Sequence, residues 1–133
     1  MRVFLDTNVL VSAFAARGLC ADVLETVTVG HQLVVGRTVL AELARALRVK
    51  VKVPSTQCEE MVNFVRDEAA TVVDAAEAVD APVEQDDRQV LGEAQAGGAE
   101  VFVTGDAAVV ALRKVGEMHI VTPREFWEEL RQR

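Results

Sequence analysis

The feature that most constrains this chain is a repeated alternation of short apolar runs with longer segments of helical periodicity. Five apolar runs stand out, at about residues 2–5, 33–35, 71–73, 101–103 and 120–121. Strands that alternate with helices in this way are typical of a parallel sheet joined by right-handed crossovers and covered on both faces. We therefore predict one α/β domain over residues 1–133, with three α/β/α layers and a central, mainly parallel sheet of about five strands.

Length and composition fit one globular domain of this kind. The 133 residues suffice for one sizeable core, and no apolar run approaches the ~20 residues of a membrane span. The first strand is expected at about residue 2, and the N-terminus lacks the layout of a signal peptide, so we expect a cytoplasmic protein. Cys20 and Cys58 lack metal-ligand spacing and are predicted to be buried free thiols.

Four carboxylates stand where such a sheet gathers functional residues. Asp6 ends the first apolar run, and Asp106 follows the fourth. Glu42 lies near the start of the helix predicted over 38–48, and Asp87 opens the helix before the fourth run. If the first and fourth strands are neighbours, the four acids converge at the carboxyl edge, where open α/β sheets bind ligands. A cation must then neutralise them, and ligands that are all oxygen select Mg²⁺ or Mn²⁺.

Each of these acids also has a structural explanation. Asp6 and Asp106 could cap the helices that follow them, as could one of the pair Asp86–Asp87. Glu42 could pair with Arg45 at i,i+3. Capping alone does not require acids to follow two of the most apolar runs, and this joint placement favours a shared site.

The charge of the chain is unevenly distributed. Its formal net charge of −7 argues by itself against nucleic acid, because phosphate contacts need Lys and Arg. Residues 59–87 hold ten acids against one Arg, whereas 37–52 is a basic strip with Glu42 as its one acid. That strip is either a solvated helix face or, beside a catalytic site, a phosphate-contact surface formed by Arg45, Arg48, Lys50 and Lys52.

Several segments together resemble the motifs of a known family, the PIN-domain ribonucleases, and more narrowly the VapC-like toxins of toxin–antitoxin systems. The resemblance spans nearly the whole chain and is carried by Val3–Leu10, Leu40–Leu43, Asp87–Leu91 with Ala94, Val103–Asp106 and Ile120–Phe126. Such sequences often have an Asp three places before the third acid, where this chain has Glu84. The spacing to Leu91 and Ala94 assigns the third acidic position to Asp87 rather than to Asp86.

The resemblance implies a PIN-like fold and an Mg²⁺- or Mn²⁺-dependent endoribonuclease, with the metal held by Asp6, Glu42, Asp87 and Asp106. Asn8 and Thr104 would orient a ligand or a metal-bound water. The expected products of RNA hydrolysis are a 5′-phosphate and a 3′-hydroxyl. A toxin of this group implies a small antitoxin partner, whose Arg or Lys would enter the acidic cleft, and a homodimer.

Other functions on an α/β sheet fit less well. A haloacid-dehalogenase-like phosphatase needs a second Asp two residues after the first, where this chain has Asn8. A receiver-like domain needs a Lys after a late strand, and Lys114 is poorly placed for that role. A non-catalytic module that binds RNA or a protein partner on the same fold remains the alternative.

Overall fold

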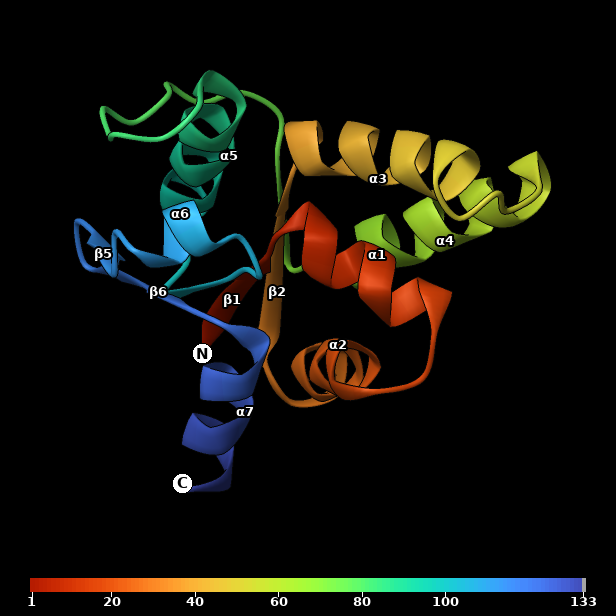
Figure 1. Cartoon of the computed structure of the whole chain (residues 1–133), viewed down its shortest axis with the longest axis horizontal. Helices are drawn as coiled ribbons and strands as arrows, with labels where there is room; N and C mark the ends of the chain where they lie inside the picture. Colours follow the sequence, from red (N-terminus) through yellow and green to blue (C-terminus); the bar gives the residue numbers. More distant parts are fainter. Residues whose placement is uncertain (133) are drawn as a thin grey trace.

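The computed structural model describes residues 1–132, and Figure 1 shows its helices around a central sheet. In this range six strands and seven helices follow one another as β1 (Arg2–Leu5), α1 (Thr7–Ala15), α2 (Leu19–Gly30), β2 (Gln32–Gly36), α3 (Arg37–Val49), α4 (Ser55–Glu68), β3 (Thr71–Val73), α5 (Gln85–Ala96), β4 (Val101–Val103), α6 (Ala107–Val110), β5 (Lys114–Val115), β6 (Met118–Val121) and α7 (Pro123–Arg131).

The sheet has the strand order β3-β2-β1-β4-β6-β5. Every pairing is parallel except that of β5 with β6, so the predicted α/β class and mainly parallel sheet are confirmed. No single helix within residues 1–132 is long and apolar enough to cross a membrane; α1 and α2 meet such a criterion only as a pair bent by 107°.

The additional strand lies where the sequence predicts the end of a helix over 107–115. Helix α6 instead stops at Val110, and Arg113 adopts a left-handed conformation with φ of 61°. The following Gly116-Glu117 pair forms a two-residue hairpin loop in which Gly116 has φ of 57°, as such tight turns require. Gly116 therefore turns the chain into the β5–β6 hairpin, which makes six strands rather than five.

The chain leaves β1 and β4 in opposite directions along the sheet. Connections from β1 to β2 and from β2 to β3 run toward one edge, whereas those from β3 to β4 and from β4 to β6 run toward the other. Right-handed crossovers then place α1–α4 on one face and α5 and α6 on the opposite face, which Figure 1 shows as helices to the right and left of the strands. The boundary between β1 and β4 is therefore the topological switch point, where sheets of this kind bind ligands.

A buried carboxylate joins the helix layers on the two faces of the sheet, just after the end of β2. Glu93 of α5 is only 2% exposed, yet no cation lies against it within residues 1–132. Its Oε1 accepts a hydrogen bond of 3.0 Å from the Thr38 amide at the start of α3, and its Oε2 accepts from the Thr38 hydroxyl and from Gln89. The sequence predicts Thr38 as a helix cap, but Gly36 holds that position and Glu93 supplies the carboxylate that the helix N-terminus favours.

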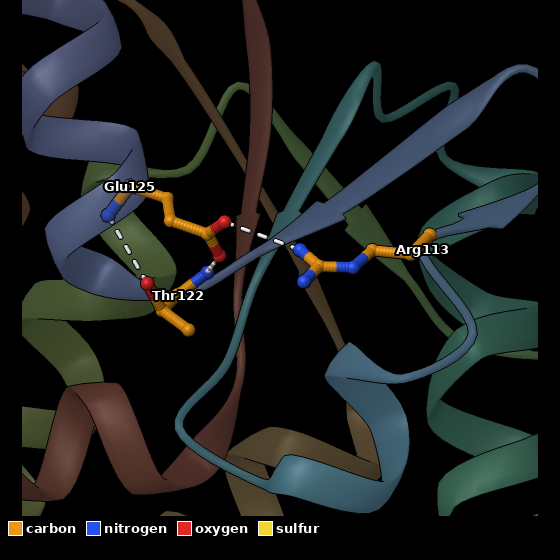
Figure 2. Close-up of polar contacts among 3 residues, drawn as sticks. All are labelled: Arg113, Thr122 and Glu125. Atoms are coloured by element: carbon orange, nitrogen blue, oxygen red, sulfur yellow. Dashed lines mark hydrogen bonds and ion pairs between the residues drawn. The ribbon is translucent and has the colours of Figure 1, made fainter.

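The last helix is fixed at its first turn. Thr122 and Glu125 form a capping box, as their spacing in the sequence predicts, and Pro123 occupies the first position of α7. Figure 2 shows that Glu125 also reaches Arg113, with 3.1 Å between its Oε2 and the Nη1 of that arginine. The Thr122 amide is the largest cause of a lowered pKa at Glu125. These contacts tie α7 to the β5–β6 hairpin.

Replacing Glu93 tests how much this buried carboxylate stabilises the fold. We expect Glu93→Leu to lower the free energy of unfolding by about 2–4 kcal/mol, because the Thr38 amide and the Gln89 side chain lose their acceptor in a buried place. Glu93→Gln keeps an acceptor oxygen and should cost less. Urea unfolding of both variants measures the difference, and equal stability of wild type and Glu93→Leu would contradict the prediction.

Candidate active site

A cleft of about 580 Å³ opens at the carboxyl ends of β1 and β4, between α1 and α3. All four acids predicted to form the site line this cleft: Asp6, Glu42, Asp87 and Asp106. They come from the end of β1, the second turn of α3, the first turn of α5 and the start of α6. Residues separated by up to 100 positions are thus brought to one place by the switch in strand order.

Asp6 is the most buried of the four, with 7% of its surface exposed. Its Oδ1 accepts the Thr7 amide at 2.8 Å, which makes Asp6 the N-cap of α1. Its Oδ2 accepts the Thr104 hydroxyl at 2.8 Å and the Asn8 side-chain amide at 3.2 Å. A carboxylate has about four acceptor positions, so one on Oδ1 remains available to a ligand. Capping and ligand binding are therefore compatible for Asp6.

Asn8 and Thr104 connect the two loops that carry Asp6 and Asp106. The Asn8 amide donates to the Thr104 hydroxyl at 3.1 Å, and its Oδ1 accepts the Gly105 amide at 2.8 Å. The Thr104 hydroxyl also accepts the Asp106 amide at 3.1 Å. Both residues predicted to support the site thus lie in one hydrogen-bond network that fixes the loops after β1 and β4.

Glu42 is held by a residue that the sequence does not single out. The Thr7 hydroxyl donates to Glu42 Oε1 at 2.7 Å, which links α1 to α3. No ion pair joins Glu42 to Arg45 within residues 1–132, so the structural alternative for Glu42 does not apply here. In the sequence, only its position beside Asp6 suggests that Thr7 belongs to the site. The packing of α3 against α1 shows that the acid it contacts is Glu42.

The two remaining acids differ in how they enter the cleft. Asp106 is the N-cap of α6 and accepts the Ala108 amide at 2.9 Å. Asp87 is not a cap, because Glu84 precedes the first residue of α5 and both Asp86 and Asp87 lie inside its first turn. Asp87 is half-buried and lines the cleft, whereas Asp86 is exposed and lines a neighbouring one. The capping alternative for Asp86–Asp87 is therefore wrong.

Burial and the proximity of these carboxylates raise the pKa values of Asp6 and Asp87. Burial is the largest cause that raises the pKa of Asp6, and the charges of Glu42 and Asp106 add to it, against hydrogen bonds from Thr104 and Thr7 that lower it. The pKa of Asp87 is raised to about 6 by burial, the largest cause, together with the nearby carboxylates, in decreasing order Asp106, Asp6, Glu84 and Glu42. Negative charge accumulates in the cleft, which favours the entry of a cation.

The donor set fits a hard divalent cation. Every acid of the cleft offers carboxylate oxygen, and neither Cys nor His lines it. Within residues 1–132, no three His, Cys, Asp or Glu side chains are already spaced as ligands of one ion. The two cysteines are free thiols outside the cleft lining, with Cys58 buried as predicted and Cys20 only half-buried.

The four cations of the predicted basic strip do not lie on one surface. Arg45 and Lys50 line the acidic cleft, whereas Arg48 lines a separate pocket between α3 and α4. Lys52 lies beyond the end of α3, in a loop where it adopts φ of 61°. Two of the four cations thus lie beside the carboxylates, and the strip does not form one continuous face.

Solved structures share the fold of this chain. A chain of the crystal structure of VapBC2 from Rickettsia felis, bound to a DNA fragment from its promoter, aligns with a TM-score of 0.65 and 15% identity over 92% of this chain and 98% of that chain. A chain of VapBC-1 from nontypeable Haemophilus influenzae gives a TM-score of 0.65 and 16% identity over 93% of this chain and 99% of that chain. Curated proteins give no significant match.

The family is shown by the sequence itself. A protein-family model described as PIN domain matches residues 2–108, a range that includes β1 through β4 and all four acids of the cleft. The chain belongs to the PIN-domain family.

Proposed function

We propose that this protein is a divalent-metal-dependent endoribonuclease and the toxin of a type II toxin–antitoxin pair. The observation that carries the proposal is the convergence of four carboxylates from four separate elements in one cleft at the switch point of the sheet. Helix capping accounts for Asp6 and Asp106, whereas Glu42 and Asp87 cap no helix. A shared cation accounts for all four.

Asp6, Glu42, Asp87 and Asp106 would hold Mg²⁺ or Mn²⁺. Such an ion, when bound, lowers the pKa of an attacking water and stabilises the charge that develops on the phosphate. The surrounding residues do the positioning: Thr104 and Asn8 fix one oxygen of Asp6, and Thr7 fixes one oxygen of Glu42. Because outer partners hold these carboxylates in place before the substrate arrives, little reorganisation is needed at the reaction.

The reaction is the hydrolysis of a phosphodiester. Water adds to phosphorus, the bond from phosphorus to the 3′-oxygen breaks, and that oxygen gains a proton to become a 3′-hydroxyl while the phosphate stays on the 5′ side. Arg45 and Lys50, on the α3 wall of the cleft, are suited to contact the backbone of the RNA next to the scissile phosphate. These cations and the metal together offset the net charge of −7 at the place where RNA binds.

A protein partner follows from the same site. The sequence resembles VapC-like toxins, and the two solved structures described above are VapBC structures. A small antitoxin that places an Arg or Lys among the four carboxylates would neutralise the charge that otherwise binds metal. We further propose a homodimer, which would lengthen the RNA-binding groove, and a location in the cytoplasm, where the RNA is.

The nuclease is tested by removing single carboxylates. Asp6→Asn and Asp87→Asn should each lower RNA hydrolysis in Mg²⁺ or Mn²⁺ at least ~100-fold, because loss of a partner outside the ligand shell already costs about 10–100-fold. Asp86→Asn is the matched control, since Asp86 is exposed and adjacent in sequence but lies outside the cleft lining. Hydrolysis of a labelled RNA by purified chain measures all three variants.

Two outcomes would contradict this assignment. If Asp86→Asn loses activity while Asp87→Asn keeps it, the wrong member of the pair has been placed in the site. If wild type binds RNA but does not cleave it with either metal, the non-catalytic RNA-binding module becomes the better description.

The protonation of Asp87 gives a test that needs no substrate. Its folded-state pKa of about 6 exceeds the ordinary value of 3.8, so the folded chain binds more protons than the unfolded chain at intermediate pH. Metal-free protein should therefore gain stability from this group as pH falls from 7.5 to 5, and the repulsion should be fully present above the folded pKa. Asp87→Asn should raise the melting temperature at pH 7.5 and less so at pH 5.

Adding Mg²⁺ at pH 7.5 should give wild type the higher melting temperature of the two proteins, because the ion stabilises wild type and binds Asp87→Asn more weakly. Thermal unfolding at the two pH values, with and without Mg²⁺, separates the effects. An unchanged melting temperature of Asp87→Asn at every condition would show that Asp87 does not face the other carboxylates.

The toxin role is tested in cells. Expression of the chain should arrest growth, Asp6→Asn should abolish the arrest, and co-expression of a small protein encoded beside it should restore growth and co-purify with it. Normal growth on expression of a chain that cleaves RNA in vitro would contradict the toxin role and leave the nuclease intact.

A further inference from the structure

The cleft has a second region that the carboxylates do not use. Helices α1 and α3 continue past the acids, and the cleft wall there is formed by Val11 of α1 with Ala46 and Val49 of α3. Val11 is half-buried against the core, and Val49 is 62% exposed. We call these three residues the aliphatic shelf.

Helical spacing places the shelf beside the acids. Ala46 and Val49 lie four and seven residues after Glu42 in α3, so they follow it along one face of the helix. Val11 lies four residues after Thr7 in α1 and faces the same cleft. Seven residues of helix span about 10 Å, and a cleft of about 580 Å³ lies within the ~300–1,000 Å³ range of small-ligand sites.

The shelf is bordered by positive charge. Arg45 and Lys50 line the same cleft, and neither forms an ion pair within residues 1–132. The cleft therefore offers carboxylates for a cation at one end and, at the other, an apolar surface next to two cations. A nucleotide matches this order, since it has a phosphate that a divalent ion can bridge, an apolar base face and a further phosphate on the other side.

We propose that the aliphatic shelf is a nucleotide subsite, which receives the unpaired base next to the scissile phosphate while Lys50 and Arg45 contact the adjoining backbone. The inference rests on the proposed nuclease function and adds where an unpaired base of the substrate lies in the cleft. A base inside a duplex is stacked and cannot reach a shelf between two helices, whereas a loop or a free strand can turn a base outward.

The subsite is tested by nuclear magnetic resonance of the full chain with labelled valine methyl groups. Adenosine and uridine 5′-monophosphate, each added with Mg²⁺, should shift the methyl signals of Val11 and Val49. Ribose 5-phosphate, which lacks the base, should leave those two signals nearly unchanged. Val29 of α2 is 82% exposed and absent from the cleft lining, so its signals should not respond to either ligand.

The contribution of the shelf to nucleotide affinity is measured with two matched variants. Val49→Ser should weaken nucleotide binding about three- to tenfold, as expected for loss of part of one apolar contact, without affecting the fold. Val29→Ser is the control for an exposed valine and should bind like wild type. Single-stranded RNA should likewise bind Val49→Ser more weakly than wild type, and duplex RNA should not distinguish the two.

The outcomes separate this inference from the proposed function. If the chain cleaves RNA but Val11 and Val49 do not respond to nucleotides, the subsite is wrong and the nuclease stands. If both valines respond and no cleavage occurs, the subsite holds and the nuclease fails. If the antitoxin shifts both valines while nucleotides do not, the shelf is a protein-docking surface and the inference is overturned.

Discussion

The parallel pairing of β1 with β4 is the constraint on which the site depends. Phe4 and Phe102 stack in the middle of this pair with ring centroids 5.2 Å apart, and both are buried in the core. The pairing aligns Leu5 with Val103, and the Asp6 amide extends the ladder by donating to the Val103 carbonyl at 3.0 Å. The acid thus takes its place from the register of the sheet, whereas a surface loop would leave it mobile.

Concentrating carboxylates at this edge works against stability. Burial and mutual repulsion raise the pKa values of Asp6 and Asp87, which means that the folded chain holds their charged forms less favourably than water does. Hydrogen bonds from Thr104 and the Thr7 amide offset part of this at Asp6. A local arrangement that weakens the fold and that a bound cation or a proton relieves is expected at a functional site.

The sequence predicted the strand–helix alternation, and the four acids that it singles out do line one cleft, because strand ends and helix starts follow from local patterns. It did not reveal contacts that depend on how helices pack. Glu93 lies at the edge of the apolar face of α5, near Val90 and Ala94, and that position was the available signal for burial. Its partner Thr38, 55 residues away, could be found only from the packing of α5 against α3. The sequence also did not show that the cations of the basic strip line different clefts, because this too depends on how the helices pack.

Helix α3 joins these observations. Its buried row, which includes Leu43, anchors it to the core, and Glu93 fixes its first turn from the opposite layer of the sheet. The same rigid helix presents Glu42 to the acidic end of the cleft and Val49 to the aliphatic shelf. Because one helix carries both, any shift of α3 against α1 would move a candidate metal ligand and the shelf together. The bond from Thr7 to Glu42 spans that interface, so it couples the geometry of the two ends of the cleft.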